Sequence, residues 1–203
     1  NDRNRYLATA LSVIPEVELT VDEPPTTVDS GAYDVIVYSN VDPSRLLRGN
    51  VAAGRDLLEA GGGVAIQAQP NLPDRYGDLL LIEPTGTGQS PAIRRTASGP
   101  LTRDITFSPP ETYISGPLRA GQPAVELGDG SPLIATADRG SGRLLYYGYI
   151  EESSSFKYNY QYPVFWKRAV YDLAGRPPLS ELNLDTGARL SFPNETTVTT
   201  PAG

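Results

Sequence analysis

The chain contains no cysteine and no histidine among its 203 residues. Without cysteine it has no disulfide, no thiol nucleophile and no thiolate metal ligand, and without histidine it lacks the commonest general base and transition-metal ligand. Neither a Ser-His-Asp triad nor a Cys-His pair can be assembled from this sequence. The absence of cysteine fits either side of a membrane, so it does not indicate a redox compartment.

Long hydrophobic runs are missing as well. No stretch of about 18 apolar residues occurs, and the N-terminus lacks the basic-then-apolar pattern of a signal peptide. We therefore expect this polypeptide to be soluble and not to span a membrane by itself. It starts at Asn1 without a methionine and stops directly after a strand-like run, so we expect a piece of a longer protein.

Lysine is scarce, because Lys157 and Lys167 are the two lysines and every other basic residue is arginine. The net charge is −7 and the isoelectric point is near 4.6. Nucleic-acid binding relies on clustered basic residues that displace counterions, so this charge balance argues against a nucleic-acid partner. Arginine in place of lysine on an acidic protein favours a halophilic source, although GC-rich coding has the same effect.

Hydrophobic periodicity predicts an α/β fold. Apolar residues recur at helical spacing over residues 4–13, and alternating residues over 17–22 predict a strand with one wet face. Continuous apolar runs over 33–40 and 63–69 predict adjacent inner strands of a parallel sheet, with a short helix between them. This order of elements is typical of a doubly wound, mostly parallel sheet, amidotransferase-like or flavodoxin-like.

The second half of the chain reads differently. Residues 70–125 are rich in proline and glycine and are expected to be ordered but irregular. A hairpin over 132–150 precedes a helix with Pro163 in its first turn. Beyond Arg176 a further hairpin pattern begins. We therefore predict an α/β domain over residues 1–176 and a β-rich extension over 177–203, the start of a following domain.

Four segments carry a family resemblance: YDVIVYSNVDP, LLEAGGGVAIQAQ, SPLIATADRGSGRLLYYGYI and YPVFWKRAVYDLAG. In this order they resemble the class I glutamine amidotransferase-like domains of membrane-anchored proteins that also carry von Willebrand factor A modules. The resemblance covers residues 1–175, and the hairpin followed by the PVFW helix is its most specific part. It implies an amidotransferase-like fold, a membrane-associated parent protein, a haloarchaeal source, and a strand ahead of the first helix.

The catalytic residues of that superfamily are absent. Its catalytic members carry cysteine at a sharp turn after the strand that corresponds to Val64–Gln67, with histidine and glutamate later in the chain. Here Ala68 and Gln69 occupy the turn, and the later segment offers Glu151 and Glu152 without histidine. We therefore predict that the protein is not an enzyme of this kind, with no catalytic residue, no cofactor and no metal.

Polar residues at the ends of the predicted strands form a candidate ligand site. They should point into the crevice at the carboxyl ends of the sheet, where such folds bind ligands. The alternative is that these side chains cap backbone groups of nearby loops. The candidate residues are Ser39, Asn40, Asp42, Gln67, Gln69, Glu151 and Glu152.

An aromatic stretch offers a second candidate site. Tyr158, Tyr160 and Tyr162 alternate and could form a surface for a partner protein or a sugar, because tyrosine combines a large rigid ring with a polar tip. The alternative is that they pack the crossover onto the end of the sheet. In the helix that follows, Val164 is expected to face the core. Trp166 is expected at the boundary, packed against Tyr162 or the returning strand, with its indole N–H bonded to an acceptor.

Together these features predict a non-catalytic binding or scaffolding module of a larger membrane-associated protein. Its partners are expected to be proteins or neighbouring domains of the same chain. One rival is a carbohydrate-binding or oligomerisation module, similar to a related domain that assembles some β-galactosidases, which an exposed tyrosine patch in an oligomer contact would favour. Another is a carboxylate-dependent hydrolase in which Asp42, Glu151 and Glu152 supply the acids, as two carboxylates do in glycosidases.

Overall fold

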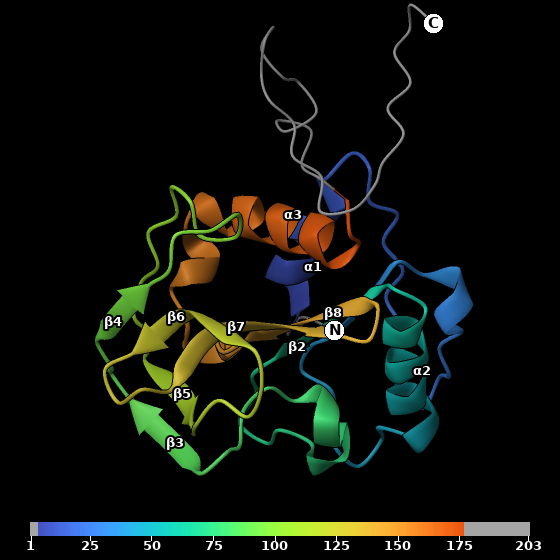
Figure 1. Ribbon diagram of the computed structural model, residues 1–203, viewed down its shortest axis with the longest axis horizontal. Helices are drawn as coiled ribbons and strands as arrows, with labels where there is room; N and C mark the ends of the chain where they lie inside the picture. The colour runs from blue at the N-terminus through green and yellow to red at the C-terminus, as the bar shows by residue number, and fades with distance from the viewer. Residues whose placement is uncertain (1–3, 177–203) are drawn as a thin grey trace, which may run out of the picture.

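The computed structural model describes residues 4–176. Its main sheet has the strand order β1–β2–β8–β7–β6–β4 (Figure 1). Neighbours are parallel from β1 to β8 and antiparallel from β8 to β4. The strands are β1 (Val35–Tyr38), β2 (Gly63–Gln67), β8 (Gly142–Tyr147), β7 (Pro132–Arg139), β6 (Gln122–Leu127) and β4 (Ile93–Thr96). The predicted α/β fold class is confirmed, with antiparallel strands extending the parallel part.

Helices cover both faces of this sheet. α1 (Arg5–Ser12) and α3 (Gln161–Leu173) lie on one face and α2 (Arg48–Glu59) on the other (Figure 1). Successive side chains of a strand point to opposite faces, so β8 contributes to two cores. Leu145 and Tyr147 join the core beneath α1 and α3, whereas Leu144 and Tyr146 join the core beneath α2. None of the helices within residues 4–176 is long and apolar enough to cross a bilayer.

Helix α3 is rotated relative to the sequence-based expectation. Trp166 is fully buried, and its ring centroid lies 4.9 Å from that of Tyr147 in β8, whereas Val164 is 41% exposed. The predictions of a boundary position for Trp166 and a buried Val164 are therefore wrong. Burying an indole removes more apolar surface from water than burying a valine does, which favours the observed rotation. The predicted packing of Trp166 against Tyr162 and the returning strand is confirmed, whereas no hydrogen-bond partner for its indole N–H is found among the described residues.

The edge of the sheet at β1 also departs from expectation. β1 and β2 are adjacent, as predicted, but β1 is the outermost strand of the described sheet and not an inner one. Residues 17–22, predicted as a strand, form no strand, because no backbone hydrogen bond joins them to β1 or to another described segment of the sheet. The alternating pattern is present, and a pairing partner for it is missing from residues 4–176.

Part of the proline- and glycine-rich middle is regular. β3 (Gly86–Gln89) and β5 (Thr112–Ser115) form a separate antiparallel pair, and β4 lies between them in sequence. The expectation of irregular structure throughout residues 70–125 is therefore too broad. The β7–β8 hairpin agrees with the prediction. The predicted β-rich extension over 177–203 lies outside the described residues, so that domain boundary stays a prediction.

Candidate functional site

The predicted crevice lies where the parallel strands end. β1 leads into Ser39 and Asn40, β2 ends at Gln67, and β8 is followed by the 3-10 turn η4 (Glu151–Ser153). Carboxyl ends of parallel strands meet at one edge of a sheet, so these segments come together. A cavity of about 850 Å³ opens at this edge. Its lining includes the predicted residues Ser39, Asn40, Asp42, Gln69 and Glu152.

Asn4, which precedes α1, closes one side of the crevice. Its side-chain Nδ2 donates to the Ser39 carbonyl at 3.0 Å, and its Oδ1 accepts from Asn40 Nδ2 at 2.7 Å. Ser39 Oγ lies 2.9 Å from Asn4 Oδ1 and also contacts Gln67 Oε1. One hydroxyl hydrogen serves one of these two acceptors at a time. Asn4 therefore ties the start of α1 to the end of β1 and makes no side-chain cap on its own helix.

Gln67 connects the ends of β1 and β8. It is fully buried, and its Nε2 donates to the Tyr149 carbonyl at 3.2 Å and to Glu151 Oε2 at 3.1 Å. Burial raises the pKa of Glu151, and the hydrogen bond from Gln67 and the charge of Lys157 oppose that rise. The other carboxyl oxygen, Oε1, has no hydrogen-bond partner among the described residues. Gln67 and Glu151 thus form a buried polar link between strands and do not line the cavity.

Gln69 holds the loop after β1. Its Oε1 accepts from Val41 N at 2.8 Å, and its Nε2 donates to the Val41 carbonyl at 2.7 Å. The second amide hydrogen is directed to the Asn71 carbonyl at 2.8 Å. The side chain therefore acts as a one-residue continuation of the sheet, which matches the backbone-capping alternative for this residue.

The remaining carboxylates lie at the surface. Asp42 is exposed and accepts from Ser44 N at 2.9 Å and Ser44 Oγ at 2.7 Å, an arrangement typical of an Asx turn. Glu152 is also exposed and lines the cavity. Glu151, whose pKa is raised, faces Gln67 and not the cavity. A glycosidase-like pair needs an acid of raised pKa in the cleft, and Glu151 does not take that position.

The turn after β2 carries no nucleophile. Ala68 is fully buried, and its backbone N donates to the Tyr147 carbonyl at 2.8 Å, which continues the parallel ladder. Within residues 4–176 no group of three or more Asp, Glu, His or Cys side chains is placed to hold a metal ion. The cavity therefore offers amides and hydroxyls for hydrogen bonding and charged groups at its rim, including Arg5 and Arg45.

The three predicted tyrosines do not share one surface. Tyr158 is 68% exposed and Tyr160 is 81% exposed, but Tyr162 is 2% exposed. Tyr162 begins the buried face of α3, and its ring packs edge-on against Trp166 with centroids 6.4 Å apart. Tyr162 therefore belongs to the core, and of the three tyrosines predicted for the interaction surface only Tyr158 and Tyr160 are exposed.

Two cations and a third aromatic ring complete this surface. Tyr6 of α1 meets Tyr158 edge to face at 5.2 Å. Lys157 Nζ lies 5.4 Å from the ring centroid of Tyr6 and 5.2 Å from that of Tyr158, and Arg5 lies 5.3 Å from Tyr6. Each such cation–π contact at an exposed site contributes roughly 0.5–1 kcal/mol, which favours the observed orientation of the rings. We call these four residues, Arg5, Tyr6, Lys157 and Tyr158, together with the exposed Tyr160 two positions further along the chain, the aromatic-cationic cluster.

Sequence reasoning missed Asn4, Arg5 and Tyr6. Asn4 precedes a predicted helix, where asparagine usually caps, so nothing in the pattern indicated a bond to β1. Arg5 and Tyr6 are distant in sequence from the tyrosine stretch, and only the packing of α1 beside α3 brings them together. Arg5 lines the cavity as well, so the cluster borders the crevice.

Comparison with protein families gives two matches. The family described as Domain of unknown function (DUF7408) matches residues 1–169, and the one described as Domain of unknown function (DUF7406) matches residues 176–203. No curated protein matches the chain.

Solved structures share the fold at low identity. The cytoplasmic protein STM1381 from Salmonella typhimurium LT2 is 16% identical with a TM-score of 0.69, over 83% of this chain and 86% of that one. The cytoplasmic protein STM3548 from Salmonella typhimurium is 14% identical with a TM-score of 0.69, over 84% and 86%. The exo-beta-1,4-mannosidase Op5Man5 from Opitutaceae bacterium strain TAV5 is 20% identical with a TM-score of 0.55, over 85% of this chain and 31% of that one.

Proposed function

We propose that this chain, which belongs to the family described as Domain of unknown function (DUF7408), is a non-catalytic module that binds a protein partner through its aromatic-cationic cluster. The observation that carries the proposal is the exposure of Tyr158 and Tyr160, at 68% and 81%. Tyrosine and arginine are enriched where protein interfaces gain most of their binding energy. The rings of Tyr6 and Tyr158, which make cation–π contacts, should lose less conformational freedom than free rings when a partner binds.

The crevice beside the cluster supports the non-catalytic part of the proposal. The amide of Gln69 is used within the protein, and Gln67 is buried. Covalent amidotransferase chemistry requires a nucleophile and a base, and the chain has neither cysteine nor histidine to supply them. Asp42 and Glu152 line the cavity, but Glu151, whose pKa is raised by burial, does not, so hydrolysis by paired carboxylates is a weaker proposal.

We further propose a setting for the module. It would be one domain of a larger, membrane-associated protein of halophilic, haloarchaeal origin, with neighbouring domains or other proteins as partners. The match of a second family to residues 176–203 supports a multidomain chain. The four segments quoted from the sequence support the resemblance to von Willebrand factor A-containing proteins, and with it the membrane association.

Site-specific photo-crosslinking tests the proposed surface. In its native cells, the parent protein would carry p-benzoylphenylalanine in place of Tyr160. The matched control carries the same group in place of Val13, which is also exposed, at 63%, but lies at the C-terminal end of α1, whereas Arg5 and Tyr6 lie at its N-terminal end. We expect a discrete protein crosslink from position 160 and none from position 13. In a second test, Tyr160→Ala should weaken binding of the partner so identified.

Two results would contradict this proposal. Equal crosslinking from positions 160 and 13 would show that the cluster is not a preferred surface. Loss of glycan binding in Tyr160→Ala, without any protein crosslink, would favour the carbohydrate-binding rival instead.

A further inference from the structure

Two arginines share one carboxylate on the surface of the 3-10 turn η3 (Asp74–Leu79). Arg55 of α2 donates through Nε and Nη2 to Asp78 Oδ1, at 2.9 and 2.7 Å. Arg139, the last residue of β7, donates to Asp78 Oδ2 and, at 2.9 Å, to the Asp78 carbonyl. One carboxylate balances only one of the two positive charges, and each guanidinium keeps further N–H donors beyond those that bind Asp78.

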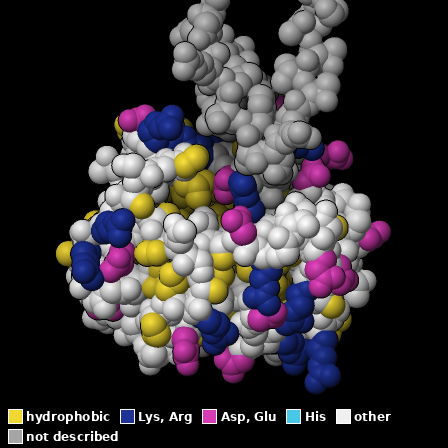
Figure 2. Space-filling view, in the orientation of Figure 1, with side chains coloured by type: hydrophobic (Ala, Val, Ile, Leu, Met, Phe, Trp, Pro, Cys, Tyr) yellow, Lys and Arg dark blue, Asp and Glu magenta, His cyan; other side chains and the backbone are white. Residues whose placement is uncertain are grey.

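Two more arginines extend this positive surface. Arg119 Nη1 donates to the Gly77 carbonyl at 3.0 Å, and Arg75 belongs to η3 itself. Neither of them makes an ion pair with a residue that the structure describes. Figure 2 shows Lys and Arg side chains gathered over α2 and η3. We call Arg55, Arg75, Arg119 and Arg139 the arginine cluster. Its four cations outnumber the two carboxylates of η3, Asp74 and Asp78, although the chain as a whole has a net charge of −7.

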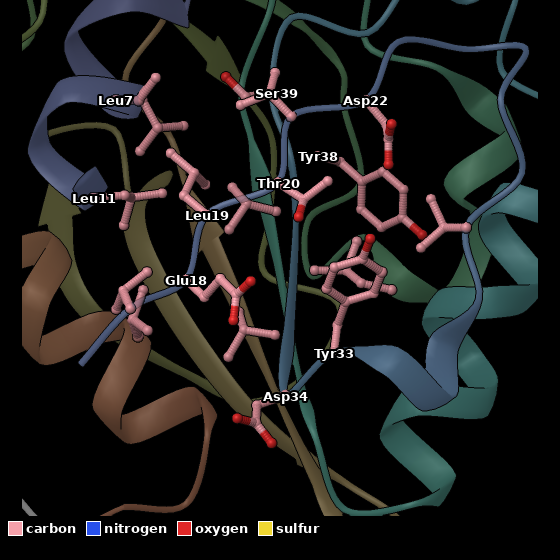
Figure 3. Close-up of a pocket in the computed structure, with 18 of the residues that line it drawn as sticks. Leu7, Leu11, Glu18, Leu19, Thr20, Asp22, Tyr33, Asp34, Tyr38 and Ser39 are labelled. Atoms are coloured by element: carbon pink, nitrogen blue, oxygen red, sulfur yellow. The ribbon is translucent and has the colours of Figure 1, made fainter. Parts of the chain in front are cut away.

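Residues 16–23, which we call the acidic segment, carry the opposite charge. They run as an extended chain along a groove of about 500 Å³ beside β1 (Figure 3). The segment has four exposed acids, Glu16, Glu18, Asp22 and Glu23. Within residues 4–176 no ion pair joins any of them to a basic residue. The sequence has neither lysine nor arginine between Arg5 and Arg45, so this stretch of chain supplies no cation of its own.

We propose that the arginine cluster of one molecule binds the acidic segment of a second copy of the chain. The two surfaces have opposite charge, and each includes charged groups that make no ion pair within the described part of its own molecule. Guanidinium and carboxylate groups pair in a bidentate geometry, which gives the contact direction as well as attraction. A single exposed ion pair contributes little, so several of these pairs must form together.

An extended acidic segment suits a cluster whose cations come from separate elements. Glu18 and Asp22 are four residues apart, which in an extended chain is roughly 13 Å at about 3.3 Å per residue. Successive carboxylates therefore reach different guanidiniums, which α2, η3, β7 and the loop between β5 and β6 supply. A nucleic acid also offers anions, but the net charge of −7 repels a long polyanion.

The contact joins two different surfaces, so it is heterologous. Each molecule carries one cluster and one segment, and contacts of this kind build rings or open chains of molecules instead of two-fold dimers. The arginine cluster and the acidic segment share no residue with the aromatic-cationic cluster. This inference therefore does not depend on the proposed binding function.

Mixing two association-deficient variants tests the proposal. The cluster variant carries Arg119→Gln with Arg139→Gln, and the segment variant carries Glu18→Lys with Asp22→Lys. In sedimentation equilibrium at one fixed ionic strength, the wild-type mass should rise with concentration above the 21.8 kDa of one chain. Each variant alone should have its dissociation constant raised about tenfold, because charge pairs are lost from the interface. An equal mixture should form complexes of two chains and no larger species, since each pair retains one intact cluster and one intact segment.

Matched variants control for the change in net charge. Arg95→Gln with Arg103→Gln, and Glu83→Lys with Glu111→Lys, alter exposed residues outside both surfaces by the same charge and should associate as wild type does. Arg119→Gln alone leaves the bonds to Asp78 in place and serves as a second cluster variant if the double substitution does not fold.

Three results would overturn the proposal. A wild-type chain that stays monomeric up to millimolar concentration would show that the two surfaces do not bind each other. Association that is unchanged in the cluster or segment variant, or equally weakened in the matched variants, would place the contact elsewhere. A mixture of the cluster and segment variants that stays monomeric would show that the cluster does not receive the segment.

Discussion

At the scale of single residues, the most consequential side chain in the crevice is Glu151. It is 5% exposed, bonded by Gln67 through one oxygen and without a described partner for the other. Burial disfavours the charged form of this carboxyl, which is why its pKa lies above the ordinary value. The folded state consequently pays for ionising it as the pH rises.

Glu151→Gln tests this cost. The pKa of Glu151 is higher in the folded protein than in the unfolded chain, where it is near 4.5, so this group stabilises the folded state below that pH. The stabilisation is lost as the pH rises through the pKa of the folded state. The glutamine variant does not ionise, so we expect its free energy of unfolding to exceed that of wild type at neutral pH and to converge with it in acid. Each unit of pKa difference is worth about 1.4 kcal/mol. Urea unfolding at several pH values measures the difference in free energy of unfolding between the variant and wild type. A difference that stays constant with pH would contradict the raised pKa of Glu151.

Trp166 provides the second prediction at this scale. Trp166→Ala removes a fully buried indole that packs on Tyr147 and should cost on the order of 3–5 kcal/mol. Val164→Ala on the same helix is the matched control, and because Val164 is 41% exposed its effect should be within about 0.5 kcal/mol. Denaturant unfolding measures the free energy of unfolding of both variants. Similar losses of stability from the two would show that α3 does not bury Trp166 and expose Val164 as described.

The sequence predicted some of these residues and not others. Gln67 and Gln69 were identifiable because they end a buried apolar run, and strand ends of parallel sheets are known meeting points. The sequence did not reveal whether their amides face a ligand or the backbone, since that depends on where the loop after β1, with Val41, and the loop after β2, with Asn71, lie. Asn4 was unpredictable because its partner, Ser39, is 35 positions away.

At the scale of elements, the contact between β2 and α3 depends on a residue without a side chain. A Cβ at Gly63 would lie 2.4 Å from Leu173 Cβ and 2.5 Å from the Leu173 carbonyl oxygen, so Gly63→Ala must push the end of α3 from the sheet. We expect a loss of about 1–3 kcal/mol, as overpacking usually costs. Gly49→Ala in the exposed first part of α2 has no atom within 4 Å and should stabilise by up to about 1 kcal/mol. Thermal unfolding compares the two, and stabilisation by both would refute the close approach.

The sequence-based prediction of strands failed where strand formation depends on a pairing partner. The alternation over 17–22 is that of a strand, but β pairing requires a neighbouring edge at hydrogen-bonding distance, and the described chain leaves a groove there. β3 and β5 were missed for the opposite reason. β3 (GTGQ) is rich in glycine and has a weak intrinsic preference for strands, so it gains its conformation from pairing with β5. β5 (TYIS) contains strand-favouring residues but is only four residues long.

At the scale of the whole molecule, the absence of cysteine and histidine leads to a prediction about chemistry. Incubation of the protein with glutamine should release no ammonia above a heat-denatured control, because the covalent route lacks its nucleophile and its base. General acid–base assistance alone contributes roughly 10²–10⁴-fold. Asp42 and Glu152 line the cavity, so the double variant Asp42→Asn, Glu152→Gln is the control if ammonia release is seen. Release that persists in the native wild type and vanishes in this variant would establish carboxylate-dependent hydrolysis.

The buried position of Trp166 also determines how the protein emits light. Trp166 is the chain's single tryptophan. Its ring centroid lies 4.9 Å from that of Tyr147 and 6.4 Å from that of Tyr162. Light absorbed by these tyrosines should pass to the indole by resonance energy transfer, so the folded protein excited at tyrosine wavelengths should emit mainly as tryptophan. Unfolding separates the rings, and tyrosine emission should then reappear while the indole emission moves to longer wavelength. The ratio of the two emissions reports, without any added label, whether α3 is seated on β8.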